Sequence, residues 1–199
     1  MAKRAFDLLA AGLGLVLLAP LMLWIAWSIK RDTPGPVLFR QERVGRHGKP
    51  FMIRKFRTMV HAPGTAGAQI TVGADPRITR YGAWLRARKL DELPQLIDVL
   101  VGTMSLVGPR PEVPRYVARY PAALRDVVLS VRPGITDPAS IAFRDEAELL
   151  ARAADPEREY VELILPQKLE HAARYARCAS LATDLGVLLR TLAVLATRS

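Results

Sequence analysis

The feature that most constrains this chain is an uninterrupted apolar run near its N-terminus, residues 6–29, with the sequence FDLLAAGLGLVLLAPLMLWIAWSI. After Asp7 no charged residue occurs until Lys30. As a helix, such a run is long enough to cross a hydrocarbon core of about 30 Å. It is also longer than the apolar part of a signal peptide and lacks a convincing small-residue cleavage site. The sequence therefore predicts a membrane-embedded unit at residues 1–31.

The charges around the run leave its topology open. Pro20 lies in the middle and removes one backbone hydrogen bond, which predicts a kink. Basic pairs stand at both ends, at residues 3–4 and 30–31, so the positive-inside rule favours neither end for translocation. Two arrangements remain: a single tilted span with a proline kink, and a re-entrant hairpin that enters and leaves one leaflet, bent at Pro20.

The remaining residues, 32–199, are expected to form one compact cytoplasmic domain. Residues 37–56 read as a small β-hairpin around the turn 45–49. Helical patterns follow at 79–90, 91–101, 113–128, 144–154, 156–177 and 181–196, and the last could lie in the membrane interface. The expected fold class is α+β and mostly helical, with a small β-hairpin, interfacial amphipathic helices and the N-terminal membrane helix.

The charge balance indicates an anionic partner. The chain has 29 Lys and Arg against 19 Asp and Glu, a formal net charge of +10. Such a surface favours nucleic acid, anionic lipid headgroups or phosphorylated substrates. No nucleic-acid reading motif is present, and a single cysteine, Cys178, excludes an intramolecular disulfide. The three histidines lack metal-ligand spacing, and no Walker A or G-x-S-x-G sequence occurs.

The acidic pair Asp91-Glu92 is the main candidate for chemistry. Acidic residues before an apolar run are usually helix caps, and that explanation is sufficient for the pair taken alone. The alternative is that one carboxylate is a nucleophile towards phosphorus and the other a ligand for Mg²⁺. Basic residues favour this second interpretation, because guanidinium groups bind phosphate. Arg86 lies just before the pair, and Arg110 and Arg132 stand in turns rich in Pro and Gly.

Several motifs, taken in order, resemble the bacterial sugar transferase family, the monotopic polyprenyl-phosphate phosphoglycosyl transferases in their small form. The resemblance covers residues 3 to about 189, nearly the whole chain. Its motifs are KRAFD at 3–7, PGPVLFRQ at 34–41, RVG at 43–45, KFRTM at 55–59, DPRITR at 75–80, LDELPQL at 90–96, MSLVGPRP at 104–111 and VRPGIT at 131–136. Each is weak alone, and the ordered set is specific.

The resemblance implies a re-entrant helix and a ping-pong reaction at the cytoplasmic face of the bacterial inner membrane. Asp91 would attack the β-phosphate of a UDP-sugar and release UMP, and polyprenyl phosphate would then take the phosphosugar from the enzyme. This is the first membrane step in assembling glycoconjugates such as exopolysaccharide or O-antigen. Glu92 would help hold Mg²⁺. Phosphates of donor or acceptor would be bound by Lys55, Arg86, Arg110 and Arg132. The anionic phospholipid membrane is an expected partner, nucleic acid is not, and a homodimer remains open.

Two departures from the family pattern limit what is carried over. The helix break has Ala19 before Pro20, where many members have serine. After VRPGIT the chain continues with Asp137 and Pro138 instead of a Gly, aromatic and Asn-Gly-Arg run, so the donor sugar stays unassigned. The alternative function is a non-catalytic basic module that binds anionic lipid or nucleic acid at a membrane surface.

Overall fold

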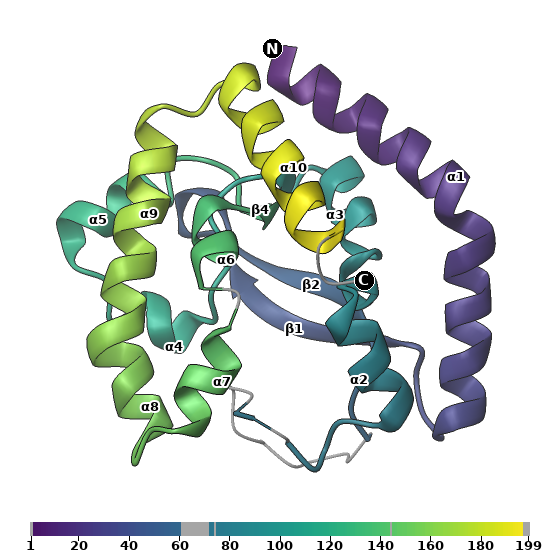
Figure 1. Ribbon diagram of the computed structural model, residues 1–199. Coiled ribbons are helices and arrows are strands. Elements are labelled where there is room, and N and C mark those ends of the chain that lie inside the picture. The colour runs from purple at the N-terminus through teal and green to yellow at the C-terminus, as the bar shows by residue number, and fades with distance from the viewer. Residues whose placement is uncertain (1, 61–71, 74, 144, 197–199) are drawn as a thin grey trace.

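The computed structural model describes residues 2–60, 72–73, 75–143 and 145–196. One long helix runs along one side of the molecule, further helices cover the opposite side, and a β-hairpin lies between them (Figure 1). Helices outweigh the two small two-stranded sheets. The predicted class, α+β and mostly helical, is confirmed.

The N-terminal helix α1 is continuous from Ala2 to Asp32, with Pro20 inside it. Its 31 residues correspond to about 46 Å. The helix bends about midway as it follows the rest of the molecule (Figure 1). Because Pro20 lacks the N–H that would bond one turn back, a bend is tolerated there without a break. The helix is thus continuous and bent, a form compatible with both the kinked span and the re-entrant arrangement.

The outer surface of α1 is apolar and unpartnered. It is the one helix among the described residues that is long and apolar enough to cross a membrane, and only 11% of its most apolar window is buried. Leu9, Val16 and Leu17 are 76%, 72% and 68% exposed. Water-facing helices do not carry such a surface, so α1 has the character of a lipid-contacting helix.

The inner side of α1 packs on two apolar clusters. Its first half contacts α3, Gln95–Val101, through a cluster formed by Ala11, Ile53, Leu96, Val99 and Met104. Its second half contacts α2, Arg80–Ala87, through Ile25, Ile29, Phe56 and Leu85. The membrane helix is thus part of the core of the domain.

The predicted β-hairpin is confirmed. Strands β1, Leu38–Val44, and β2, Pro50–Phe56, pair antiparallel and are joined by the short turn η1, Arg46–Gly48. His47 in that turn has a positive φ of 58°. In this register Lys55, a predicted phosphate ligand, lies opposite Phe39 near the end of the hairpin.

A second sheet was missed by the sequence reading. Strands β3, Ser105–Val107, and β4, Gly134–Thr136, pair in parallel. Two glycines allow this contact: a Cβ on Gly108 would lie 2.2 Å from the Arg132 carbonyl oxygen, and one on Gly134 would lie 2.0 Å from the Gly108 nitrogen. The two Pro/Gly-rich turns of the sequence therefore lie back to back.

Most of the remaining helices form the opposite side of the molecule, whereas α10, Leu181–Ala196, begins near the start of α1 and runs across the middle of the view (Figure 1). The helix predicted at 113–128 is divided at Pro121, because a residue preceding proline disfavours the helical conformation. The elements are α4 Pro114–Val117, α5 Ala122–Val128, α6 Pro138–Ala142, α7 Glu146–Ala151, α8 Pro156–Glu159, a π turn η3 Tyr160–Ile164, α9 Leu165–Arg177 and α10 Leu181–Ala196. The long helix expected at 156–177 is present as α8, η3 and α9 in succession.

Candidate active site

The acidic pair lies in a tight turn between α2 and α3. Lys89 has a positive φ of 57° and begins the 3₁₀ turn η2, Leu90–Glu92. Both carboxylates are 7% exposed. The helix expected at 91–101 starts only at Gln95, and neither carboxylate caps it. Helix capping therefore does not explain why two acids stand here.

Glu92 is held by two cations. Its Oε1 accepts a hydrogen bond from Lys55 Nζ at 2.7 Å and another from Arg110 Nη2 at 2.7 Å. Burial by itself would raise the pKa of Glu92, but the charges of Arg110 and Lys55 outweigh it and hold that pKa well below its usual range. Glu92 is therefore an ionised group that fixes two phosphate-binding candidates beside Asp91.

Asp91 is in the opposite situation. Its Oδ1 is buried and has no hydrogen-bond partner among the described residues. Burial, together with the negative charge of Glu92, raises the pKa of Asp91, while Lys55, Lys89 and Arg86 act against that rise. A carboxylate oxygen that no donor occupies is free to approach an electrophile, and the three nearby cations favour its ionised form against the effect of burial.

Arg86 reaches the pair from α2. Its Nε donates to Thr58 Oγ1 at 2.9 Å, and its charge acts on Asp91. Gly82, one turn earlier, allows α2 to approach this segment: a Cβ there would lie 2.1 Å from the Thr58 carbonyl oxygen. The side chain of Thr79 caps the same helix by accepting from the Gly82 N–H. A close contact between backbones thus positions Arg86.

Arg110 is fixed by a residue that the sequence reading did not include in the site. The backbone N–H of Arg110 donates to Asp137 Oδ2 at 3.1 Å, while Asp137 Oδ1 accepts from the Ser140 N–H at 2.6 Å and caps α6. Asp137 is 1% exposed. The available signal was an aspartate directly before a proline that opens a helix, the pattern of an N-cap.

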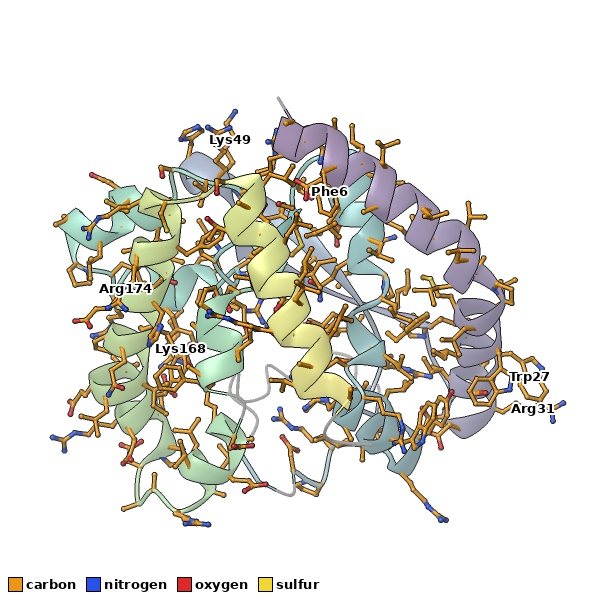
Figure 2. All side chains as sticks on the ribbon, turned by 45° about the horizontal axis from the view of Figure 1, so that its top comes forward. Phe6, Trp27, Arg31, Lys49, Lys168 and Arg174 are labelled. Carbon is orange, nitrogen blue, oxygen red and sulfur yellow. The ribbon has the colours of Figure 1, made fainter. Side chains whose placement is uncertain are left out.

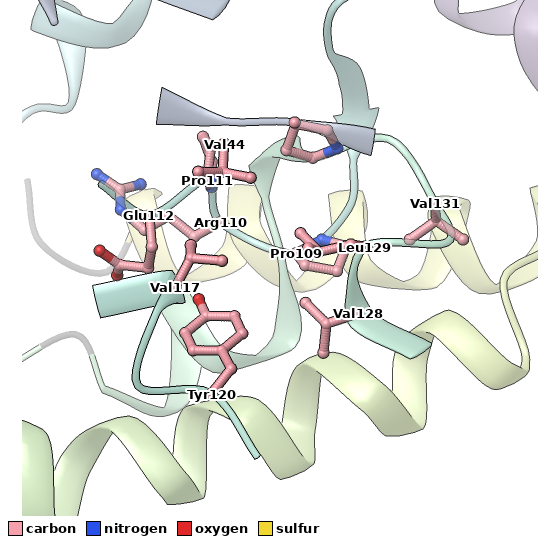
Figure 3. A pocket seen from close by; sticks show the side chains of 12 residues that line it. Val44, Pro109, Arg110, Pro111, Glu112, Val117, Tyr120, Val128, Leu129 and Val131 are labelled. Carbon is pink, nitrogen blue, oxygen red and sulfur yellow. The ribbon is translucent and has the colours of Figure 1, made fainter. Parts of the chain in front are cut away.

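A small cavity lies behind the Arg110 turn (Figure 3). It is lined mainly by apolar residues, with Arg110, Glu112 and Tyr120 among its lining groups. It has room for about one water molecule. A sugar nucleotide does not fit in this cavity, so the cavity is not a donor site for Asp91 and Glu92, the acidic dyad.

Arg132 is not brought to the dyad. Its Nε donates to the Gly102 carbonyl at 2.9 Å, at the end of α3. The charged groups that act on its guanidinium are Arg4, Arg46 and Asp7. Of the four predicted phosphate ligands, the structure gathers Lys55, Arg86 and Arg110 around Asp91 and Glu92 and places Arg132 elsewhere.

The dyad offers few ligands for a metal ion. The described residues contain no group of three or more His, Cys, Asp or Glu that could hold one. The orphaned Oδ1 of Asp91 and the second oxygen of Glu92 are the acceptors left, since Lys55 and Arg110 both contact Oε1. This set fits Mg²⁺, which commonly takes one or two carboxylates and completes its shell with water and substrate phosphates.

Comparison with known proteins identifies the family of this chain. The chain matches the model of the bacterial sugar transferase family over residues 1–198. A UDP-glucose:undecaprenyl-phosphate glucose-1-phosphate transferase of Caulobacter vibrioides is 42% identical over 98% of this chain and 70% of its own length. The chain belongs to the bacterial sugar transferase family, as the motifs predicted.

Other relatives are longer or carry a different donor in their names. A UDP-N-acetylgalactosamine-undecaprenyl-phosphate N-acetylgalactosaminephosphotransferase of Aeromonas hydrophila is 37% identical over 98% of this chain and 44% of its own length. An exopolysaccharide production protein of Rhizobium leguminosarum is 51% identical over 54% of each chain. The match covers 44% of the length of the Aeromonas relative and 54% of the length of the Rhizobium relative, and the family includes enzymes named for two different sugars.

Proposed function

We propose that this chain moves a sugar 1-phosphate from a UDP-sugar to undecaprenyl or another polyprenyl phosphate and releases UMP. The observation that carries the proposal is the buried Oδ1 of Asp91, which has no hydrogen-bond partner among the described residues. Next to it in sequence is Glu92, which binds the two cations Lys55 and Arg110. Membership of the bacterial sugar transferase family and the names of the relatives support the same reaction. The Rhizobium relative's name makes exopolysaccharide assembly one candidate pathway.

The reaction proceeds in two displacements at one phosphorus. A carboxylate oxygen of Asp91 attacks the β-phosphorus of the UDP-sugar, and the bond to the bridging oxygen breaks so that UMP leaves with the electron pair. A phosphate oxygen of the polyprenyl phosphate then attacks the same phosphorus and displaces the Asp91 carboxylate. An acyl phosphate is a reactive intermediate, so the second step needs no further activation of the enzyme.

The cations around the dyad stabilise charge in both steps. Arg110 and Lys55 contact Glu92 and can extend their remaining N–H groups to the diphosphate, and the charge of Arg86 acts on Asp91. Magnesium, when bound, neutralises phosphate oxygens. We assign Glu92 as the protein ligand of magnesium and Asp91 as the nucleophile. Arg110 stays in place because Asp137 holds its backbone.

The way α1 contacts the domain supports a re-entrant topology. At its start Arg4 donates to the Val99 carbonyl at 2.8 Å, and at its end Arg57 donates to the Thr33 carbonyl at 2.7 Å. Both ends therefore dock on one domain, whereas the ends of a spanning helix lie on opposite sides of about 30 Å of hydrocarbon. Near the exit the Arg31 guanidinium lies 4.1 Å from the Trp27 ring, and both point away from the domain (Figure 2), as interfacial groups do. The domain at 32–199 would then lie at the cytoplasmic face.

The test is release of UMP by the purified full chain in detergent with Mg²⁺ and undecaprenyl phosphate, across a panel that includes UDP-glucose and UDP-N-acetylgalactosamine. One donor should give UMP, and Asp91→Asn should lower the rate by at least about a thousandfold because the nucleophile is lost. With labelled donor and no acceptor, the wild type should retain label on the protein and Asp91→Asn should not.

The control is Asp126→Asn, which removes a carboxylate that is 82% exposed and remote from the dyad contacts. It should release UMP at the wild-type rate. Near-normal release by Asp91→Asn would exclude Asp91 as the nucleophile. If no UDP-sugar yielded UMP, the non-catalytic anion-binding module would replace the transferase.

A further inference from the structure

Three arginines gather at the end of α3, away from the dyad. Arg4, on α1, donates to the carbonyls of Val99 and Leu100 at 2.8 and 3.2 Å. Arg132 donates to the Gly102 carbonyl at 2.9 Å. A Cβ added to Gly102 would lie 3.2 Å from Arg4 Nη2, so the two guanidiniums share this helix end. Arg46, at the hairpin tip, donates to Ser130, two residues before Arg132, at 2.8 Å.

These contacts use a small part of what the three side chains offer. Each guanidinium carries five N–H groups. Together the three make four hydrogen bonds to backbone carbonyls, and none is ion-paired with a carboxylate in the described part of the chain. Asp7 is the acidic group whose charge reaches Arg132, but its two oxygens already accept from Ser105 and from the Leu106 N–H.

The cluster is therefore a concentration of positive charge that the charge of Asp7 offsets only in part. Burial and the charges of Arg4 and Arg46 lower the pKa of Arg132, the direction expected where like charges crowd together. The carbonyls at the end of α3 offset part of this repulsion through the helix dipole. An anion bound to the free N–H groups would offset the rest, and guanidiniums bind phosphate oxygens with two parallel hydrogen bonds.

The position of the cluster identifies the source of the anion. Leu8 follows Arg4 by one helical turn on the same face of α1, and Leu9 and Leu13 are exposed beyond it. Lys49, at the hairpin tip, lies at the same edge of the molecule as Phe6 (Figure 2). Apolar helix surface thus passes directly into basic surface, the profile that a lipid meets with its chains and then its headgroup.

We propose that Arg4, Arg46 and Arg132 form a binding site for the phosphate of an anionic phospholipid headgroup, separate from the dyad. The site rests on the proposed membrane embedding of α1, and it would fix the N-terminal end of that helix at headgroup level. Arg132 thereby contacts a lipid phosphate and not the transferred one.

The experiment is native mass spectrometry of the full chain in uncharged detergent, titrated with phosphatidylglycerol or phosphatidylcholine. One phosphatidylglycerol should bind at least about tenfold more tightly than phosphatidylcholine. The double variant Arg46→Gln/Arg132→Gln should lose about tenfold in affinity for phosphatidylglycerol. Arg119→Gln, an exposed arginine after α4, is the control and should bind like the wild type. Equal binding of both lipids, or an unchanged double variant, would overturn the site.

Two further measurements distinguish a lipid site from a site for soluble phosphate, and the arginine site from the dyad. Inorganic phosphate at tenfold excess should leave phosphatidylglycerol bound. Displacement would mean a site for soluble phosphate and would overturn the lipid assignment. Asp91→Asn should keep full lipid binding while losing UMP release, because the two sites share no residue. A wild-type protein that releases UMP but binds both lipids equally would reject the arginine site and leave the transferase assignment standing.

Discussion

At the scale of single residues, Glu92 links the two halves of the candidate site. Its contacts come from β2 through Lys55 and from the turn after β3 through Arg110. Glu92 and Lys55 are largely removed from water and Arg110 is about one-third exposed, so these charges interact more strongly than fully exposed surface pairs do. Glu92 is thus a structural support for the cations as well as the residue we assign to magnesium.

Replacing Glu92 by glutamine should destabilise the fold. Removing one partner of a buried ionic group leaves the others uncompensated, which costs about 3 kcal/mol here, the low end of the usual range because Arg110 is partly exposed. The measurement is equilibrium unfolding in detergent at pH 7. Glu157→Gln is the control, since its pair with Arg115 is exposed, and it should change the free energy of unfolding by less than about 1 kcal/mol.

The same carboxylate predicts a pH dependence. The folded-state pKa of Glu92 is lowered, so its contribution to stability is fully present above the unfolded value of about 4.5 and is lost as pH falls through the folded value. The stability difference between wild type and Glu92→Gln should therefore shrink below about pH 4.5. A difference that stayed constant between pH 7 and pH 3 would contradict the ion pairs.

Sequence reasoning found most of the residues at the dyad and missed those that act through the backbone. Arg86 and Arg110 could be selected because cations near an acidic pair suggest phosphate chemistry. Asp137 could be recognised as a helix cap but not as part of the site, because its role there depends on the backbone N–H of Arg110, 27 residues away. Arg132 stands in a similar turn, yet its side chain goes to the end of α3. Side-chain direction is set by packing, which local sequence does not encode.

At the scale of elements, helix α2 is placed by its contact with the strand-end segment at Thr58. Gly82 makes the contact feasible, and Arg86 lies one turn further along the same face. The orientation of α2 and the position of Arg86 therefore depend on one missing side chain.

Gly82→Ala should destabilise the protein by about 1–3 kcal/mol, because the new methyl group meets backbone that cannot give way, and should lower UMP release by moving Arg86. Gly186→Ala in α10 is the matched control. Nothing lies within 4 Å of its added Cβ, so it should stabilise the helix by up to about 1 kcal/mol. Thermal unfolding and UMP release measure both. Equal effects of the two alanines would refute the close contact.

The periodic and turn-bounded elements were the ones predictable from sequence. The apolar run, the hairpin and the helix at 181–196 all have repeating patterns, and the structure contains each. The β3–β4 pair was missed because each strand has three residues, too few for a period to appear. The break at Pro121 was overlooked although proline signals it.

At the scale of the whole molecule, α1 is one wall of the domain and also the helix that we propose to lie in the membrane. Near its start, Arg4 bonds the Val99 carbonyl on α3. At its end, Arg57 bonds the Thr33 carbonyl just after the helix. A helix so attached at both ends cannot place its start across a bilayer without giving up one set of contacts.

Cysteine labelling in bacterial cells tests this topology. In a Cys178→Ala background, Ala2→Cys should resist a membrane-impermeant maleimide in intact cells and react after permeabilisation. Ala123→Cys, on α5 in the domain, is the control and should behave in the same way. Labelling of Ala2→Cys in intact cells would show that α1 spans the bilayer.

The attachment of the first helix to the last has a consequence for biosynthesis. Lys3 bonds Asp184 on α10, which also accepts from Tyr175 at 2.6 Å, and the two bonded residues are 181 positions apart. At translation rates of about 5–20 residues per second, roughly 10–40 s separate their synthesis. The emerging apolar helix therefore meets the bilayer well before its final protein contact exists. In the membrane arrangement that we propose, insertion comes first, and residue 184 must be synthesised before the start of that helix can be locked in place.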